Sequence, residues 1–283
     1  MYKLSPWNAV VFSGGILLWT CFVPFFLILC ISISWTSLLL FPFSFLFSHQ
    51  YLKHPYTYPR SILRDYVSSI PWHTWFKIKS YTTLPLNTII MIHPHGLLGL
   101  GALAIFHFVS DSQTLFAIAP LLFYNPLFVI LGPHLGLVPA NKIGILTALK
   151  MRQSLIILPG GIPEIICTEF ENRTLFIKRR FGIFKLAQQQ SVNLLPVLIV
   201  NEERMYNTVK LPCLKRRVYW SWRLNVPFLF PYPIGLFYSI IPQRVPLELE
   251  IGPVISSTET SLLALKKKYE VAFQCMNIQG RII

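Results

Sequence analysis

The sequence predicts an α/β fold preceded by a hydrophobic membrane hairpin. Three runs of apolar and β-branched residues have the length of buried strands, and each is followed by a turn: Thr88–Ile92, Ser154–Leu158 and Asn193–Val200. Segments with the apolar spacing of helices separate these runs, as in a domain built from layers of sheet and helix. Ahead of them, an uncharged stretch extends from Leu4 to Leu52.

The uncharged stretch is long enough for two membrane-crossing helices, each of which needs about 20 apolar residues. Lys3 precedes it, and Lys53, Arg60 and Arg64 follow it. Basic residues on both flanks place both ends in the cytosol. We therefore expect residues 1–52 to form a transmembrane or re-entrant helical hairpin and residues 53–283 a cytosol-facing, membrane-associated domain. A double span and a re-entrant hairpin both satisfy the sequence.

Helices and strands are expected to alternate through residues 53–283. The further expected elements are a helix at Leu97–Val109, a strand at Thr114–Ile118, a helix at Asn141–Arg152 capped by Asn141, a strand or turn at Leu175–Arg180, a helix at Gly182–Gln190 and a strand at Pro246–Pro253.

The last expected helix follows a capping box formed by Ser256 and Glu259. Its apolar residues recur at helical spacing and should face the core, with Lys266–Lys268 on the other side. The core-facing residues are Leu262, Leu265, Tyr269, Phe273 and Met276.

The amino-acid composition limits the classes of molecule that the protein is expected to bind. Hydrophobic residues make up 53% of the 283 residues, charged residues make up only 13%, and the net charge is +14. This balance suits an anionic membrane surface or a polyphosphate ligand. Nucleic acid is not expected, because no helix-turn-helix, zinc finger or aromatic RNA-binding strand is recognisable. A metal site is not expected either, because the five cysteines form no Cys-x-x-Cys pair and no ligand cluster is spaced for metal.

Two histidines, His93 and His95, end the first strand in the sequence His93-Pro94-His95-Gly96. Gly96 permits a tight turn there, and α/β sheets bind ligands at the carboxyl ends of their strands. Histidine titrates near neutral pH and can take a proton from a hydroxyl group, which suggests general base catalysis. The alternative is a structural role for one of the two.

Two other strand ends carry candidate residues. Gly160 and Gly161 follow the second strand and can offer backbone amides to an oxyanion, although a plain turn explains them equally well. Glu164 comes soon after them, and Glu202 follows the third strand. Acidic residues are scarce in this chain, so we expect both carboxylates to orient a histidine or a substrate hydroxyl.

The segment Lys178–Ala187 is basic and opens a helix, with Arg179, Arg180 and Lys185 as candidate phosphate ligands. Free amides, the helix dipole and guanidinium groups together suit a phosphate. The alternative is a basic face resting on anionic lipid. A base, oxyanion donors and a phosphate site beside a membrane anchor predict acyl transfer from a phosphate-bearing, water-soluble donor to a lipid alcohol.

These motifs resemble those of the diacylglycerol O-acyltransferase type 2 and monoacylglycerol acyltransferase family. His93-Pro94-His95-Gly96, followed by Leu97 to Ala102, resembles its signature, and Pro159-Gly160-Gly161 with Glu164 resembles its second block. Arg180-x-Gly182-x-x-Lys185-x-Ala187, followed by Asn201-Glu202, resembles its third block. The resemblance extends over residues 60–260.

The resemblance implies a glycerolipid-acyltransferase-like mixed sheet flanked by helices. It implies an enzyme of the endoplasmic reticulum membrane that esterifies diacylglycerol to triacylglycerol, with acyl-CoA as co-substrate and no other cofactor. His95 is then the preferred base, and His93 supports the turn or polarises the carbonyl. The other implied roles are oxyanion or turn residues (Gly96, Gly160, Gly161), ligands of acyl-CoA (Arg179, Arg180, Lys185) and carboxylates that orient His95 or the acceptor (Glu164, Glu202).

The sequence departs from the family pattern in three places. The Tyr-Phe-Pro element is not evident, Ile183 stands where Phe is usual, and Asn201 stands where Gly usually precedes Glu202. These departures bear on acceptor specificity more than on reaction class. The His-x-x-x-x-Asp dyad of the related glycerophosphate acyltransferases is absent, because Leu98 and Leu100 occupy the aspartate offset.

Two alternatives stay open. The acceptor can be a monoacylglycerol, a wax alcohol or a sterol, because an apolar pocket accepts many tails. A non-catalytic, membrane-shaping hairpin protein would need the hairpin but neither the histidine turn nor the basic segment. Acyl-chain preference, homo-oligomerisation and transfer to lipid droplets are also left open by the sequence.

Overall fold

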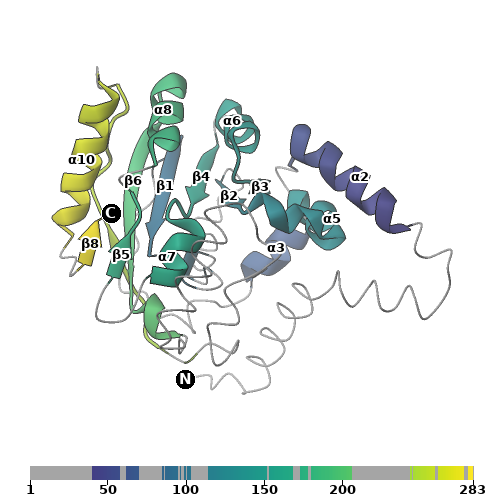
Figure 1. The fold of residues 1–283 in the computed structure, drawn as a ribbon, viewed down its shortest axis with the longest axis horizontal. Coiled ribbons are helices and arrows are strands. Elements are labelled where there is room, and N and C mark those ends of the chain that lie inside the picture. Colours follow the sequence, from purple (N-terminus) through teal and green to yellow (C-terminus); the bar gives the residue numbers. More distant parts are fainter. Residues whose placement is uncertain are drawn as a thin grey trace.

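The computed structural model describes residues 40–57, 62–69, 85, 87–94, 96, 99, 101–102, 114–151, 153–167, 173–177, 180–205, 243, 245–258, 261–276 and 280–282. In these residues the fold is a mixed sheet flanked by helices, as predicted (Figure 1). The six strands run in the order β3-β2-β4-β1-β6-β7. Neighbouring strands are parallel except for β7, which pairs antiparallel with β6. A separate two-stranded sheet joins β5 and β8.

The strands of the larger sheet are β1 (Thr88–His93), β2 (Thr114–Ile118), β3 (Leu137–Pro139), β4 (Ser154–Ile157), β6 (Asn193–Val200) and β7 (Glu248–Ile251), and the smaller sheet holds β5 (Arg173–Leu175) and β8 (Gly280–Ile282). The helices are α2 (Leu40–Lys53), α3 (Ile62–Ser69), η3 (Pro120–Tyr124), α5 (Pro126–Leu135), α6 (Lys142–Lys150), α7 (Gly161–Cys167), α8 (Phe181–Gln190), η4 (Glu202–Met205) and α10 (Leu262–Gln274).

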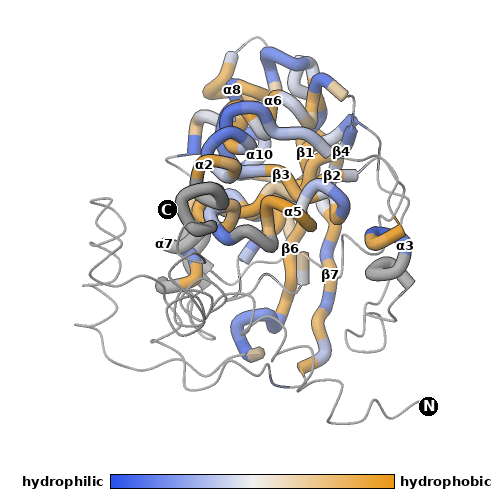
Figure 2. Tube along the Cα trace, turned by 90° about the vertical axis from the view of Figure 1, so that its right-hand side faces the viewer, coloured by the Kyte–Doolittle hydropathy of each residue, from blue (hydrophilic) through white to orange (hydrophobic). Residues whose placement is uncertain are grey.

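Strand β1 lies between β4 and β6, and all six of its side chains are buried. Alternate residues face opposite sides of the sheet. Ile89 and Met91 belong to the apolar cluster formed with α6, α8 and α10. Ile90 and Ile92 belong to the second cluster, formed with α2, η3 and α5. Burial on both faces explains the continuous apolar run, and Figure 2 shows hydrophobic residues along β1 and β6.

Helix α10 confirms the predicted core face but not the predicted start. Leu265, Tyr269 and Phe273 are fully buried. The helix begins at Leu262, with the Ser261 hydroxyl accepting from the backbone N–H of Ala264 (3.5 Å). The predicted capping box of Ser256 and Glu259 is therefore wrong. The reason is that the preceding residue, Ile255, pairs with the sheet.

Ile255 is still paired with the sheet, because its backbone N–H and C=O both bond to Leu194. The Ser256 hydroxyl instead contacts that of Thr258 (2.8 Å). Lys266 is also not on the solvent side as expected. It is 6% exposed, lies 3.7 Å from Glu270 and stacks over the Phe181 ring at 4.0 Å.

Two other stretches differ in part from the prediction. The strand or turn expected at Leu175–Arg180 begins earlier, as β5. The segment 120–139, for which the sequence predicted no element, folds into η3, α5 and β3, with Pro133 inside α5. The expected cap of α6 is confirmed, since the Asn141 side chain accepts from the backbone N–H of Gly144 at 2.8 Å.

The predicted membrane hairpin falls mostly outside the described residues. Its last part is α2, whose Tyr51 hydroxyl donates to the Leu137 carbonyl (3.3 Å) and whose Tyr51 ring packs on Phe123. Within the described part of the chain, no helix combines the length and the apolar character that a membrane crossing requires. Of the helix expected at Leu97–Val109, Gly99, Gly101 and Ala102 are described. Gly101 and Ala102 are helical, whereas Gly99 is not and has a left-handed φ of 60°, so the helix does not extend over the first residues expected.

The corrected start of α10 predicts unequal costs for two serine substitutions. Ser261→Ala should lower the free energy of unfolding by about 1 kcal/mol, because it leaves an N-terminal amide of α10 without its acceptor. Ser256→Ala, at the position of the rejected capping box, should change it by less than about 0.5 kcal/mol. Chemical denaturation of the purified variants measures both values. Equal costs, or a larger cost at Ser256, would contradict the observed cap.

Candidate active site

Three turns with candidate residues meet at one edge of the sheet. Strands β4, β1 and β6 are adjacent and parallel, so their carboxyl ends lie side by side. His93 is the last residue of β1, Gly160 follows β4, and Glu202 follows β6. This is the edge at which α/β sheets bind ligands, so the strand order brings together what the sequence separates.

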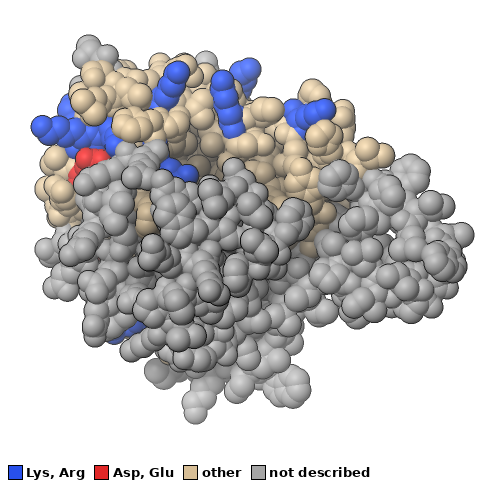
Figure 3. Space-filling model, in the orientation of Figure 1, with Lys and Arg blue, Asp and Glu red and all other residues tan. Residues whose placement is uncertain are grey.

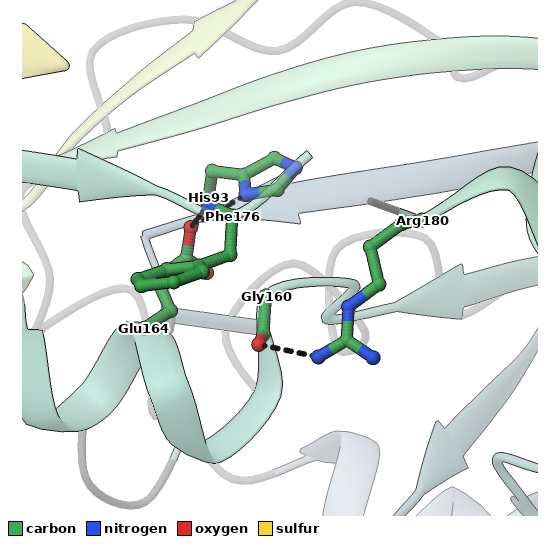
Figure 4. A network of polar contacts seen from close by, with 5 residues as sticks. All are labelled: His93, Gly160, Glu164, Phe176 and Arg180. Atoms are coloured by element: carbon green, nitrogen blue, oxygen red, sulfur yellow. Dashed lines mark hydrogen bonds and ion pairs between the residues drawn. The ribbon is translucent and has the colours of Figure 1, made fainter. Parts of the chain in front are cut away.

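His93 and Glu164 form a buried pair. The Nδ1 atom of His93 lies 2.9 Å from Oε1 of Glu164, and both side chains are fully buried. Glu164 comes from the first turn of α7, and its Oε1 also accepts from the backbone N–H of Phe176 at 3.4 Å (Figure 4). The His93 ring makes a T-shaped contact with the Phe273 ring of α10, with 5.1 Å between the ring centroids. The imidazole is therefore fixed from two sides.

This pairing determines what His93 can do. An ionised carboxylate only accepts hydrogen bonds, so the tautomer that fits such a partner has its proton on Nδ1 and its lone pair on Nε2. In the described part of the chain, Nε2 has no hydrogen-bond partner, although it is buried. A carboxylate on one ring nitrogen thus orients the imidazole and leaves the other nitrogen facing the interior.

Gly160 makes room for this pair. A Cβ at this position would overlap the Glu164 carboxyl group. The Gly160 carbonyl accepts from Nη2 of Arg180 at 3.0 Å, so the backbone here also holds the guanidinium (Figure 4). Gly161 opens α7 with a left-handed φ of 59°. The glycines expected as oxyanion donors thus have a steric and positioning role that the sequence did not indicate.

Two of the expected phosphate ligands, Arg180 and Lys185, are described. Arg180 precedes α8 and reaches the turn after β4, whereas Lys185 is exposed on α8. Arg179, like His95, falls outside the described residues. Exposed lysines also occur on α6 and α10, and Figure 3 shows basic side chains gathered along the upper face of the molecule. These exposed lysines are Lys142, Lys150, Lys267 and Lys268.

Glu202 lies under the turn after β1 rather than against His93. It is 1% exposed, and its Oε1 accepts from the backbone N–H of Gly101 at 3.5 Å. Burial is the main cause that raises the pKa of this carboxyl from 4.5 to about 8. The preceding Asn201 has a φ of 75°, and Asn tolerates this left-handed region better than most residues. Asn can therefore occupy a position at which the family usually has Gly.

The site includes residues that sequence reasoning assigned only to the core or not at all. Phe176 donates its backbone N–H to Glu164, and a backbone contact of this kind leaves no mark on the side-chain sequence. Tyr269 is fully buried, and its hydroxyl has no partner among the described residues. Burial, and then the charge of Glu164, raise the pKa of Tyr269 well above its usual value. Tyr269 and Phe273 lie on one face of α10, and the helical spacing predicted that face.

Comparison with known proteins adds independent information. The diacylglycerol acyltransferase family model matches residues 26–266. The chain is 29% identical to diacylglycerol O-acyltransferase 1 of Saccharomyces cerevisiae over 56% of this chain and 42% of that protein. It is 28% identical to human 2-acylglycerol O-acyltransferase 1 over 70% and 72% of the two chains. It is 27% identical to acyl-CoA wax alcohol acyltransferase 1 of Mus musculus over 75% and 78%. The chain thus spans less than half the length of the yeast relative.

The steric role of Gly160 predicts a contrast between two glycine variants. Gly160→Ala should lower the free energy of unfolding by about 1–3 kcal/mol, because the added methyl group displaces the Glu164 carboxyl. Gly182→Ala is the matched control, since nothing lies within 4 Å of its Cβ position. Alanine there should leave stability unchanged or raise it by up to about 1 kcal/mol in the helix. Thermal denaturation measures both, and a Gly160→Ala protein as stable as the wild type would refute the steric role.

Proposed function

We propose, because this chain belongs to the diacylglycerol acyltransferase family, that it transfers a fatty acyl group from acyl-CoA to the free hydroxyl of diacylglycerol. The products are triacylglycerol and free CoA. The observation that carries the chemistry is the buried hydrogen bond of 2.9 Å between His93 Nδ1 and Glu164 Oε1. The family predicts the reaction class, and this pair supplies a general base for it.

In the proposed mechanism, His93 Nε2 takes the proton of the acceptor hydroxyl as its oxygen attacks the thioester carbonyl. Glu164 stabilises the imidazolium that forms, because its carboxylate already accepts from Nδ1. When the tetrahedral intermediate collapses, the carbon–sulfur bond breaks, and the proton passes from Nε2 to the thiolate of CoA. Because Nε2 is buried, the acceptor hydroxyl must enter the domain to reach it, which favours transfer over hydrolysis by excluding water.

The remaining expected residues have proposed roles in binding. Arg180 and Lys185, with Arg179, are proposed to hold the phosphates of CoA, and the hydrogen bond from Arg180 to Gly160 supports a position beside the reacting centre. Gly161 is proposed to contribute its backbone amide near the oxyanion, and Gly96 is proposed to shape the turn after β1. No step requires an acyl-enzyme intermediate.

The membrane location is part of the proposal. Residues 1–52 are proposed to hold the catalytic domain on the cytosolic side of the endoplasmic reticulum membrane. The lipid acceptor and the lipid product both dissolve in this bilayer. The uncharged stretch from Leu4 to Leu52 and the net charge of +14 support this arrangement. The exposed lysines of α6, α8 and α10 suit an anionic bilayer surface.

A second acceptor class has specific support. Human 2-acylglycerol O-acyltransferase 1 and the mouse wax alcohol acyltransferase carry names for monoacylglycerol and long-chain alcohol acceptors. Each match covers more than two thirds of the relative, whereas the match to the yeast diacylglycerol enzyme covers 42% of it. An acyltransferase with one of these acceptors is therefore the second candidate. A non-catalytic hairpin protein has less support, because it gives no reason for the buried His93–Glu164 pair.

Substitution of the histidines tests the mechanism. His93→Ala should lower kcat by about 10²–10⁴-fold, the usual contribution of a general base. His49→Ala, at an exposed position on α2, is the control and should retain wild-type turnover. His95→Ala, made in parallel, tests the base that the family resemblance prefers. A fully active His93→Ala protein with an inactive His95→Ala protein would assign proton abstraction to His95 and reject His93.

An acceptor competition tests the substrate. Purified protein in detergent or lipid discs receives labelled oleoyl-CoA with equal amounts of diacylglycerol, monoacylglycerol, hexadecanol and cholesterol. The proposal expects triacylglycerol as the main labelled product. A main product of diacylglycerol or wax ester would establish the second candidate instead, and release of free fatty acid alone would contradict acyl transfer.

A further inference from the structure

We infer that Glu202 works as an uncharged carboxylic acid that holds the turn after β1 in place, and not as a catalytic base. The sequence suggested that it orients a histidine or a substrate hydroxyl. Its surroundings instead make it a positioning residue for the backbone between Gly96 and Gly101. The inference rests on the proposed function and deepens it, because this turn follows His93 and His95 in the chain.

The chain directs Glu202 toward this turn. Asn201 leaves β6 in a left-handed conformation, and its Nδ2 donates to the Pro246 carbonyl at 3.1 Å. That hydrogen bond ties the end of β6 to the segment that leads into β7. Glu202 then opens η4, where its side chain is 1% exposed. The position of the carboxyl group is therefore set by backbone that is fixed on both sides.

The carboxyl group occupies space that two glycines leave free. Oε1 accepts from the backbone N–H of Gly101 at 3.5 Å, and the backbone of Gly96 also bonds to this carboxyl. A Cβ at Gly96 would overlap the carboxyl group, and one at Gly101 would lie 2.9 Å from Oε2. Backbone and carboxyl thus pack against each other from both ends of the turn, so a displaced Glu202 would release the turn.

The surroundings of Glu202 do not support a charge. Among the described residues, no Lys, Arg or His lies within ion-pair distance of it. Within the described ranges, the charged groups that face it are Glu203 and Glu164. Both disfavour a second negative charge, and with burial they outweigh the hydrogen bonds from the Gly101 and Gly96 backbone. A buried carboxylate without a cation is costly, and such a group takes up a proton instead. The pKa of Glu202, raised to about 8, agrees with this conclusion.

A protonated Glu202 has one acceptor oxygen and one O–H donor. Oε1 serves as the acceptor for the turn, and Oε2 has no partner in the described part of the chain. In this form it cannot take a proton from a substrate. The amide of glutamine has the same shape and the same pairing of acceptor and donor, so Glu202→Gln should reproduce the function, whereas Glu202→Ala should not.

Activity measurements distinguish a neutral positioning residue from an ionised catalytic base, because glutamine can replace only the neutral acid. Glu202→Ala should lower kcat by about 10²-fold, because the loosened turn misplaces the reacting groups. Glu202→Gln should restore most of that loss and should extend activity to higher pH, since it cannot ionise. Glu203→Gln is the matched control for the loss of a neighbouring carboxylate. A Glu202→Gln protein as impaired as Glu202→Ala would overturn the inference, because that result would mean that activity requires an ionised carboxylate at this position.

Infrared spectroscopy tests the proton directly and needs no turnover. The difference spectrum between wild type and Glu202→Gln at pH 7 should show the C=O stretch of a protonated carboxylic acid, and the Glu203→Gln difference should not. A carboxylate band in place of the acid band would overturn the inference. An acid band in a protein with no acyltransferase activity would support the inference while rejecting the proposed function, so the two can fail separately.

The pH dependence of stability gives a third readout with a defined sign. The folded state keeps the Glu202 proton up to about pH 8, whereas the unfolded state loses it near pH 4.5. The stability that this group contributes is therefore complete below pH 4.5 and is lost as the pH rises toward 8. Glu202→Gln should remove this decline and raise the melting temperature by several degrees at pH 8. An unchanged pH dependence would contradict a protonated Glu202.

Discussion

The hydrogen bond between His93 Nδ1 and Glu164 Oε1 joins the end of β1 to the first turn of α7, and both groups are removed from water. A buried carboxylate is tolerated only with a partner, so the surrounding chain must hold the two at bonding distance. Gly160 leaves space for the carboxyl, the Phe176 amide adds a second donor, and Phe273 packs on the imidazole. Four separate segments of the chain therefore depend on this contact.

Glu164 and Glu202 show how two buried carboxyls at the same edge of the sheet have different partners. Glu164 bonds to an imidazole nitrogen and accepts from a backbone amide. Glu202 faces backbone amides and two acids, with burial as the dominant influence, and it favours the protonated form.

The sequence predicted the strands of the site well, because β1, β4 and β6 are buried on both faces and therefore read as continuous apolar runs. It could not predict contacts that depend on tertiary placement. Ser256 matches a capping box, but Ile255 remains paired with Leu194, so α10 starts later. The sequence assigned Glu164 to His95 or the acceptor. The structure pairs Glu164 with His93, a contact between β1 and α7 that no local sequence pattern records. The roles of His95 and Arg179 stay predictions.

The central claim is that Glu164 holds the Nδ1 proton of His93 and leaves Nε2 as the free base. Nitrogen NMR of protein labelled with ¹⁵N-histidine measures this tautomer directly, with the His93 signals assigned from their loss in a His93→Gln variant. The account predicts a protonated Nδ1 and an unprotonated Nε2 in the resting protein. It also predicts that this tautomer preference is lost when Glu164 is replaced by Leu. A protonated Nε2 with a bare Nδ1 would contradict the account, because no lone pair would then be available at the nitrogen that is to take the proton.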